Sequence, residues 1–470
     1  MRPLEWTQLG VVAAAVLVPV VFGRRLRRGR MAVLLCVVAA AQVLLEGVRW
    51  QLLPLEVATV MLAGADALRE DRRVRGFQRF RRGALGSVGV ILLGVLPAVL
   101  PVPVLPAPSG PFEVGTATFE LVDVDRPEIY GLDPPEEGEE PAEAPPRRIV
   151  VQVWYPAEPD GADPVVWNPD LDVVGPALAR RLGFPGFFLG HTDDVPSHSQ
   201  TDAAPLPGRF PVILSSHGWT GFRTINLNQV ESLASHGFIV IAPDHTYGSI
   251  AVRFPSDGSV VEYDERALPP EEDVDPDDYQ EAAEVLVETF TDDLLLVLNE
   301  LGEGSAFGEL ATHADLDKVG VFGHSTGGGA AARLCLEDAR CDAILGLDAW
   351  VNPIPDRVVA REFQVPSLFM RSDEWVDTPN DRRLRGLAER SPSLSYWIAI
   401  EGAGHNDFVM TPLFSPIAHR LGLKGPISSD RVIPIVDEYL VGFFERYLLG
   451  VGGSGLDQPP PPEVEFEVIP

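Results

Sequence analysis

The sequence predicts an α/β fold, in which helices cover both faces of a mostly parallel central sheet, preceded by an all-helical transmembrane segment. Two observations lead to this prediction. Four apolar runs occur before residue 106, and beyond that point short apolar strands alternate with helical patterns. Strands that are apolar along their whole length are typical of a parallel sheet that is buried on both faces.

The first 105 residues are the expected membrane region. A helix needs about 20 apolar residues to cross a bilayer. Three runs approach that length, and a weaker one contains Glu56 and Asp66. In chain order the four runs cover 9–23, 31–48, 52–68 and 83–105.

Two arginine clusters, at 24–30 and 72–82, orient this region. Such clusters stay on the cytoplasmic side of a membrane, so the chain has to cross twice between them. We therefore expect about four spans within 1–105, with the part of the chain after them on the extracytoplasmic side. A cleaved signal peptide fits poorly, because the positive charge follows the first apolar run.

Charge separates the two regions further. The whole chain has a formal net charge of −31. Residues 1–110 hold 14 arginines against 6 acidic residues, whereas the remainder holds 23 basic against 62 acidic residues. This asymmetry indicates two different surroundings. An acidic surface repels nucleic acid, so we exclude nucleic acid as a partner, while the oligomeric state stays open.

Residues 106–450 are expected to form one α/β domain. It carries a Pro/Glu-rich loop at 132–147 and a lid-like insert at 170–200, and a Gly/Pro-rich tail follows at 451–470. Alternating and β-branched residues predict strands, and helical patterns lie between most of them. The expected strands cover 114–124, 147–156, 210–218, 237–245, 318–325, 343–350, 365–372 and 394–402, and the expected helices 228–237, 279–302, 327–338 and 428–450.

The segment Gly-His-Ser-Thr-Gly at 323–327 lies between an expected strand and an expected helix. A Gly-x-Ser-x-Gly sequence at such a junction is typical of a nucleophile elbow. The tight turn needs small neighbours, raises the serine hydroxyl above the sheet edge and brings helix-start N–H groups beside it. The sequence therefore predicts Ser325 as a nucleophile.

A serine hydroxyl needs a base to remove its proton. His405 follows the strand at 394–402 on a late loop and is the expected base. A carboxylate has to orient the imidazole. Asp348 and Asp373 each follow a strand after Ser325, and the topology alone leaves both candidates open.

The oxyanion of an acyl transfer needs two N–H donors. One donor is expected directly after the nucleophile, at Thr326. The other is expected in the His217-Gly218-Trp219 turn after an early strand, at Trp219. This chemistry requires no metal and no organic cofactor.

Two of the three cysteines, Cys335 and Cys341, are six residues apart. They are either two buried thiols or a disulfide that closes a helix-to-strand turn. A disulfide requires an oxidising compartment, and the sequence leaves both alternatives open.

Several motifs resemble, in the same order, those of the plasma-type platelet-activating factor acetylhydrolases. The chain as a whole resembles a bacterial-type, membrane-anchored member of that family. They are "SSHGWTGFRTINLNQVESLASHGFIVIAPDH", "GHSTGG", "LGLDAW", "GAGHNDF" and "LKGPISSD". This family comprises serine-dependent, calcium-independent phospholipases of the α/β-hydrolase fold. The resemblance runs from about 111 to 449 and omits the membrane segment, the Pro/Glu-rich loop and the tail.

The resemblance implies that Ser325, Asp348 and His405 form the triad, which favours Asp348 over Asp373. It also implies Trp219 and Thr326 as oxyanion donors. Trp219 stands where such enzymes often carry another apolar residue. A backbone donor tolerates that change, but the pocket wall would differ.

We therefore expect a serine carboxylic-ester hydrolase that cleaves short acyl esters of a glycerophospholipid at the bilayer. The alternatives are a general short-chain carboxylesterase, a polyester or cutin-type esterase, and a non-catalytic, membrane-tethered binding module on a hydrolase scaffold. The phenylalanines of the insert either line an acyl pocket, dip into lipid or pack over the sheet. The candidate pocket residues are His217, His324, Phe184, Phe187, Phe188 and Trp350.

Overall fold

The computed structural model describes residues 2–21, 29–68, 76–132, 143–159, 161, 164–193, 195–304, 306–452 and 455–470. The chain divides into two compact units. The first is made mainly of Met1–Pro103, and the second contains most of the remaining residues.

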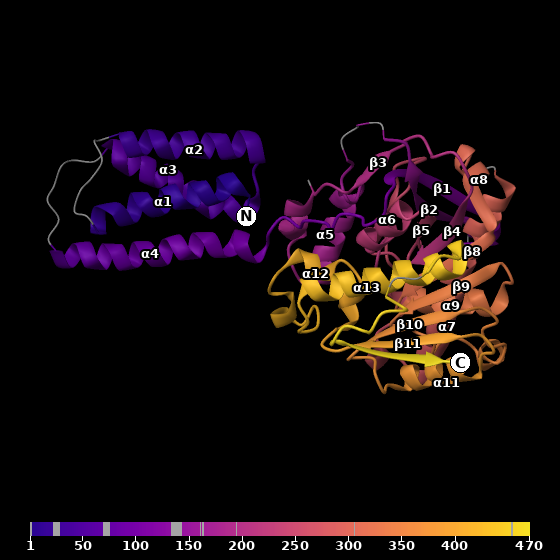
Figure 1. The fold of residues 1–470 in the computed structure, drawn as a ribbon. Coiled ribbons are helices and arrows are strands. Elements are labelled where there is room, and N and C mark those ends of the chain that lie inside the picture. Colours follow the sequence, from indigo (N-terminus) through magenta and orange to yellow (C-terminus); the bar gives the residue numbers. More distant parts are fainter. Residues whose placement is uncertain are drawn as a thin grey trace, which may run out of the picture. The chain divides into compact units, whose positions relative to one another are not determined.

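The first unit is a bundle of four helices that run antiparallel to their neighbours (Figure 1). The side chain of Asp66 accepts hydrogen bonds from the N–H groups of Gly29 and Ala32 at 3.0 and 3.2 Å, so the end of the third helix meets the start of the second. The connecting segments 22–28 and 69–75 lie outside the described residues. The helices are α1 (Pro3–Val21), α2 (Arg30–Glu46), α3 (Leu53–Leu68) and α4 (Gly76–Val99).

Apolar side chains cover much of the outside of this bundle, and its interior combines an apolar cluster that includes Val12, Leu35 and Leu55 with polar pairs. The Gln8 amide donates to the Thr59 hydroxyl at 3.2 Å, and Glu5 pairs with Arg49 at 2.5 Å, all four being buried. Water-soluble helices usually present polar side chains on their outer face. The exposed apolar side chains include Val33, Val37, Leu44, Leu45, Val57, Val60, Met61, Leu85, Val88, Ile91, Leu92 and Val95.

Among the described residues, one helical stretch, Trp50–Leu68, is both long and apolar enough to cross a membrane. Pro3–Val18 and Val88–Val99 are shorter apolar helices. The run that contains Glu56 and Asp66 is therefore helical, despite its two carboxylates. The number of spans and their orientation stay predictions.

The second unit contains a ten-stranded sheet in the order β12-β11-β10-β9-β8-β4-β5-β2-β1-β3. The stretch from β5 to β11 is parallel, while β2 and β12 pair antiparallel with its edges. The strands are β1 (Glu113–Pro127), β2 (Pro146–Ala157), β3 (Ser199–Thr201), β4 (Phe210–Ser216), β5 (Ile239–Asp244), β8 (Ala314–His324), β9 (Cys341–Leu347), β10 (Ser367–Ser372), β11 (Ser395–Ile400) and β12 (Val464–Ile469), and a separate hairpin joins β6 (Ala251–Arg253) to β7 (Val260–Glu262).

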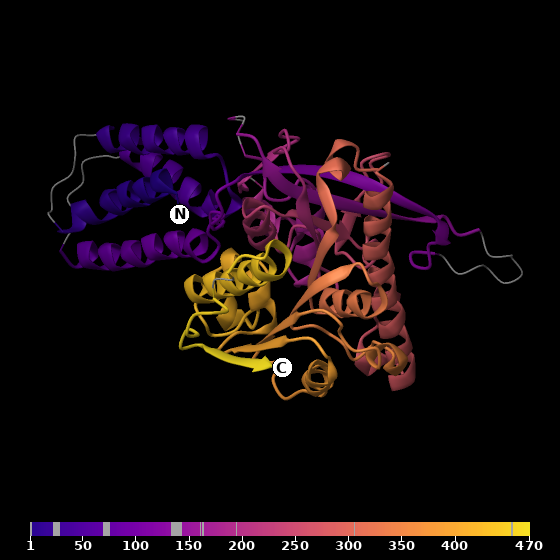
Figure 2. The same ribbon diagram turned by 45° about the vertical axis from the view of Figure 1, so that its right-hand side comes forward.

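Helices cover both faces of this sheet (Figure 2). On β8, Val319 and Val321 belong to the core cluster that also contains residues of α7 and α9. The alternate residue Phe322 packs against Phe444 of α13, with ring centroids 6.4 Å apart. The main helices are α6 (Leu227–Ser235), α7 (Pro276–Glu303), α9 (Thr326–Glu337), α11 (Pro379–Arg390) and α13 (Ser429–Phe444), and the shorter ones are α5 (Leu171–Arg181), α8 (Glu309–His313), α10 (Asp356–Val359) and α12 (Thr411–Phe414).

The predicted fold class, a mostly parallel sheet with helices on both faces, is confirmed. Burial on both faces explains why these strands are apolar without alternation. Because parallel strands end at the same edge of a sheet, the residues after β4, β8, β9, β10 and β11 gather there. This edge positions the candidate site.

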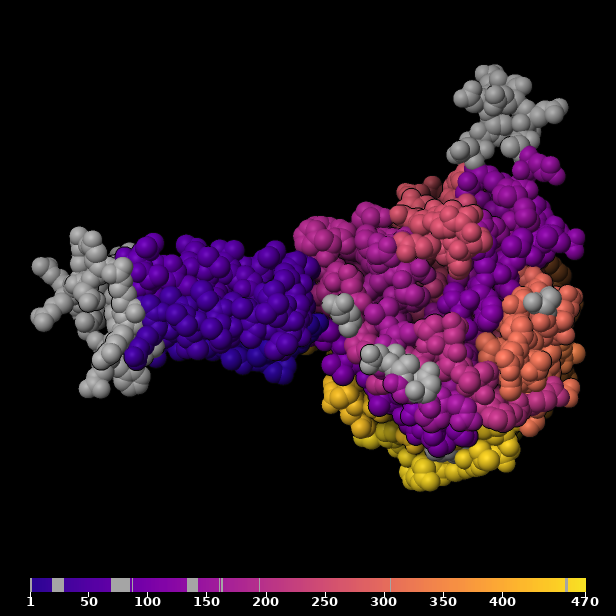
Figure 3. Space-filling view, turned by 90° about the horizontal axis from the view of Figure 1, so that it is seen from above, coloured from indigo at the N-terminus to yellow at the C-terminus, as the bar shows by residue number. Residues whose placement is uncertain are grey.

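The prediction of an appended Gly/Pro-rich tail at 451–470 is corrected for its end, because the last residues form strand β12 of the sheet. β12 pairs with β11 from Val464 opposite Ile400 to Ile469 opposite Ser395. Glu467 on this strand pairs with Arg385 of α11 at 2.6 and 2.8 Å. Four consecutive prolines lie just before the strand. Because proline is unfavourable inside a sheet, they argue against a strand in this segment when only the sequence is read. Figure 3 shows this yellow segment at one edge of the second unit.

The two predicted inserts of this unit, the Pro/Glu-rich loop and the lid-like insert, are described to different extents. Most of the predicted Pro/Glu-rich loop, 133–142, lies outside the described residues. The predicted lid-like insert at 170–200 contains α5, a short 3₁₀ helix (Gly186–Thr192) and the start of β3, which pairs parallel with β1. The insert is therefore attached to the sheet through an edge strand.

Candidate active site

Ser325 lies at the sharp turn between β8 and α9. Its backbone has φ +54° and ψ −119°, a conformation that is costly for any residue with a side chain. Hydrogen bonds hold it there. Its N–H donates to the Leu347 carbonyl at 3.0 Å, and its carbonyl accepts from the Trp350 N–H at 2.9 Å. Leu347 and Trp350 lie on either side of Asp348. The same two hydrogen bonds therefore hold the segment that contains Asp348 against Ser325.

The glycines around Ser325 are required by close backbone contacts. A Cβ at Gly323 would lie 2.3 Å from the Gly327 carbonyl oxygen, and one at Gly327 would lie 2.2 Å from that of Ser216. Neither position has room for a side chain. A Cβ at Gly218 would lie 3.1 Å from the Cβ of Ser325, so the turn after β4 passes directly beside the serine.

His405 is oriented by Asp348, which directly follows β9. Its Nδ1 lies 2.9 Å from Asp348 Oδ2. The buried carboxylate also accepts hydrogen bonds from the N–H and hydroxyl of Ser372, at 2.8 and 2.6 Å. Asp373, the other candidate acid, accepts from the Gly402 N–H at 2.7 Å and therefore braces the loop that leads to His405.

Three further side chains surround the His405 residue. The Trp375 ring stacks on the imidazole with centroids 4.9 Å apart and planes 6° apart. His324 Nε2 donates to the His405 carbonyl at 2.9 Å, and Glu374 accepts from the His405 N–H at 3.2 Å. Sequence reasoning missed Ser372, Glu374 and Trp375. Their position at the end of β10, where Ser372 is the last residue, and directly after it was the available signal.

Burial sets the protonation of these groups. It lowers the pKa of His405 to about 4, against an opposing effect of the Glu374 charge, so the ring is neutral near pH 7. Burial also lowers the pKa of His324 to about 3, with the His405 charge adding to this. Burial raises the pKa of Asp348, and the hydrogen bonds from Ser372 oppose that rise.

Two backbone N–H groups belong to the two turns that meet at Ser325. Among the described residues, no acceptor takes the N–H of Trp219 or Thr326. Thr326 is the first residue of α9, where helical N–H groups have no intrahelical partner. Donors in such positions suit a developing negative charge.

The predicted pocket residues are only partly assembled. His217 and His324 are buried in polar networks, and their place on a pocket wall stays a prediction. Trp350 is partly buried near Tyr279, at 6.4 Å between ring centroids. Phe184 and Phe188 stack on each other at 4.2 Å, and Phe187 is 60% exposed.

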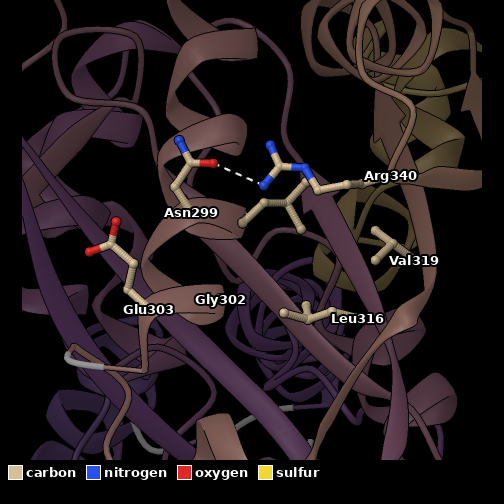
Figure 4. A pocket seen from close by; sticks show the side chains of 7 residues that line it. Asn299, Gly302, Glu303, Leu316, Val319 and Arg340 are labelled. Carbon is tan, nitrogen blue, oxygen red and sulfur yellow. Dashed lines mark hydrogen bonds between the residues drawn. The ribbon is translucent and has the colours of Figure 1, made fainter.

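The two cysteines left open by the sequence, Cys335 and Cys341, form a disulfide between α9 and β9. A shallow cavity of about 330 Å³ lies near this junction, lined by residues that include Asn299 and Arg340, whose side chains hydrogen-bond at 2.9 Å (Figure 4). It also contacts the first half of β8, far from the strand end that leads to Ser325. It therefore contains none of the predicted catalytic residues.

Most of the second unit matches a known protein family. The family described as "Platelet-activating factor acetylhydrolase, isoform II" matches residues 104–271 and 293–451, more than half of the chain. The chain belongs to this family. The match includes every predicted catalytic residue and omits the four-helix bundle.

Individual relatives agree with this assignment. Platelet-activating factor acetylhydrolase of Canis lupus familiaris is 26% identical over 323 residues, and that of Bos taurus is 28% identical over 327 residues. Each alignment covers 63% of this chain and 71% of the relative. A protein of Arthroderma benhamiae, described as "probable 1-alkyl-2-acetylglycerophosphocholine esterase", is 23% identical over 401 residues, or 77% of this chain and 93% of that one.

Among solved structures, a ferulic acid esterase from Streptomyces cinnamoneus superposes with a TM-score of 0.62 and 26% identity. The match covers 78% of this chain and 99% of that chain. The predicted α/β-hydrolase fold and the family resemblance are therefore confirmed, and this acetylhydrolase-family member is an ester hydrolase.

We predict that kcat/KM for a soluble ester falls as the pH falls, with a midpoint below 6.5. Protonation of His405 removes the base, and burial lowers its pKa. Glu374→Gln removes a charge that raises this pKa, so its midpoint should shift further toward acid. A pH–rate profile of both proteins tests this. A midpoint at or above 6.5, or a shift toward alkali in the variant, would contradict it.

Proposed function

We propose that the protein is a membrane-held serine esterase in which Ser325 is the nucleophile, His405 the base and Asp348 the orienting acid. The observation that carries this proposal is the 2.9 Å contact between His405 and Asp348 at the sheet edge where the Ser325 turn lies. The strained serine backbone and its obligatory glycines support the same assignment. A non-catalytic scaffold has no need to keep these features together.

The reaction proceeds in two steps. His405 Nδ1–H donates to Asp348, which leaves Nε2 to take the proton of the Ser325 hydroxyl as its oxygen attacks the ester carbonyl. The carbonyl oxygen becomes negative and accepts hydrogen bonds from the N–H groups of Trp219 and Thr326. Collapse of this intermediate expels the alcohol, which takes its proton from His405.

Water then completes the cycle. His405 removes a proton from a water molecule, the resulting hydroxide attacks the acyl-serine, and the carboxylic acid leaves as Ser325 recovers its proton. Burial favours the neutral form of His405 and thus the proton-accepting state. The stacked Trp375 restricts rotation of the imidazole between the two steps.

We propose short acyl esters of glycerophospholipids as the substrate class. The named relatives support this, since two are platelet-activating factor acetylhydrolases and one is described as a 1-alkyl-2-acetylglycerophosphocholine esterase. The second candidate is a general short-chain or aromatic carboxylesterase. The ferulic acid esterase likeness favours it, as does the aromatic pair Trp219 and Tyr263 beside the serine turn, at 5.9 Å.

Hydrolysis by the full-length protein in detergent distinguishes the two candidates. We predict that the protein cleaves an sn-2 acetyl phospholipid faster than a long-chain phospholipid, a butyrate ester or a ferulate ester. Ser325→Ala should lower the rate by about 10⁴-fold or more, because the nucleophile is lost. Faster cleavage of butyrate or ferulate would replace the lipid assignment, and unchanged hydrolysis by the serine variant would contradict the proposal itself.

We further propose that the four-helix bundle spans the membrane with the catalytic unit on the extracytoplasmic side. The apolar outer surface of the bundle supports a lipid environment, because exposed apolar side chains are unfavourable in water. The Cys335–Cys341 disulfide supports the extracytoplasmic side, since disulfides persist in oxidising compartments. The arginine clusters support the same orientation.

Accessibility of a tag at the C-terminus tests this topology. In intact cells, a membrane-impermeant protease should remove a tag placed after Pro470. The Cys335–Cys341 pair should resist alkylation until a reductant is added. A tag that is protected until the cells are lysed, or thiols that react without reduction, would contradict the extracytoplasmic assignment.

A further inference from the structure

Two buried histidines, His217 and His245, lie beside the active site without a place in the triad. His217 begins the turn that contains the proposed donor Trp219. His245 follows β5, and its ring centroid lies 4.9 Å from that of His217. Their hydrogen bonds connect this turn to the 244–250 segment and to α7.

The His217 side chain forms a hydrogen bond with the backbone carbonyl of Gly218. Its Nδ1 lies 2.7 Å from the Gly218 carbonyl oxygen, which also accepts from the Gly221 N–H at 2.9 Å. A carbonyl oxygen only accepts, so Nδ1 carries the proton. Burial lowers the pKa of His217 well below 6.5, so the ring is neutral and Nε2 has a free lone pair. The Ser249 hydroxyl donates to that nitrogen at 2.8 Å, and the His245 N–H donates to it more weakly at 3.4 Å, so both contacts favour this tautomer.

This contact determines where the Trp219 N–H points. The Gly218 carbonyl and the Trp219 N–H belong to one planar peptide unit, and no described peptide bond is cis. In a trans peptide these two groups point in opposite directions. Two donors on the carbonyl therefore fix the direction of the N–H. The turn is closely packed, because a Cβ at Gly221 would lie 2.9 Å from both the carbonyl oxygen and His217 Nδ1.

His245 supports the same turn through a hydrogen bond with Ser216, the last residue of β4. Its Nδ1 donates to Asp293 at 3.0 Å, and its Nε2 accepts from the Ser216 hydroxyl at 2.9 Å. Arg147 holds the Asp293 carboxylate at 2.6 and 2.7 Å. The order serine, histidine, aspartate matches that of a catalytic triad. The three side chains are only 1%, 0% and 0% exposed, however, so substrate has no access and the arrangement is a support.

We infer that His217 is a positioning residue for ester hydrolysis, whose Nδ1–H fixes the Gly218–Trp219 peptide so that the Trp219 N–H points at the forming oxyanion. This inference rests on the proposed function, because that N–H matters for catalysis only beside a reacting Ser325. His217 does not contact the substrate and acts through the peptide alone. Ser249 acts one step further back, through the tautomer.

Substitutions at His217 test this in the full-length protein with a soluble ester. His217→Leu removes the donor, whereas His217→Asn keeps an N–H at the same branch position. The leucine variant should lose about 10²-fold to 10³-fold in kcat at unchanged KM, as when an oxyanion donor is removed. The asparagine variant should recover most of that loss. Equal losses in kcat for both variants, or a loss confined to KM, would overturn the inference.

A second pair of variants keeps the test decisive if His217→Leu does not fold. Ser249→Ala removes the hydroxyl that favours the Nδ1–H tautomer of His217 and should lower kcat by about tenfold at unchanged KM. Ser395→Ala is the matched control, because it removes another fully buried hydroxyl with one side-chain partner, between β10 and β11. Unchanged kcat in Ser249→Ala, or an equal loss in Ser395→Ala, would overturn the inference.

Ser325→Ala in the same assay separates this inference from the proposed function. Hydrolysis that persists in Ser325→Ala means that the proposed function is wrong and removes the basis of the inference. Hydrolysis that requires Ser325 but is unaffected by His217→Leu means that only the inference is wrong. Loss of kcat in both variants, with recovery in His217→Asn, supports both.

Discussion

The close backbone contact at the end of β8 determines the geometry of the whole site. There is no space for a Cβ at Gly323 or Gly327, so the chain turns sharply at Ser325 and begins α9 at once. The strained serine backbone is held by Leu347 and Trp350, which lie on either side of Asp348. The proposed nucleophile and the proposed acid are therefore placed by the same hydrogen bonds, and His405 contacts Asp348 from a loop braced by Asp373.

Burial gives the histidines of this region different tasks. His405, His324 and His217 are all neutral near pH 7 because desolvation disfavours their charged forms. Each neutral ring has one N–H and one lone pair. His405 directs its N–H to Asp348, and its lone pair is the one that we propose for proton transfer. His324 and His217 direct their N–H groups to backbone carbonyls and so hold the loops on either side of Ser325.

The sequence predicts the parts of this protein that depend on local patterns. The apolar strands and the elbow follow from periodicity and from the Gly-x-Ser-x-Gly spacing, which reflects a local steric requirement. The contacts of Trp375 with His405 and of Glu5 with Arg49 join residues about 30 to 44 positions apart and follow from tertiary packing. β12 escapes prediction because its alternating residues follow a proline run and gain stability from tertiary contacts with β11 and α11.

The rate and position of labelling by a fluorophosphonate test the central claim, that the pair of Asp348 and His405 activates Ser325. Peptide mass spectrometry of the full-length protein should find the adduct on Ser325. Asp348→Asn should slow labelling by about 10²-fold or more, because the imidazole loses its orienting acid, while Asp373→Asn should label at nearly the normal rate. An adduct on another residue, or an equal loss in both variants, would contradict the account.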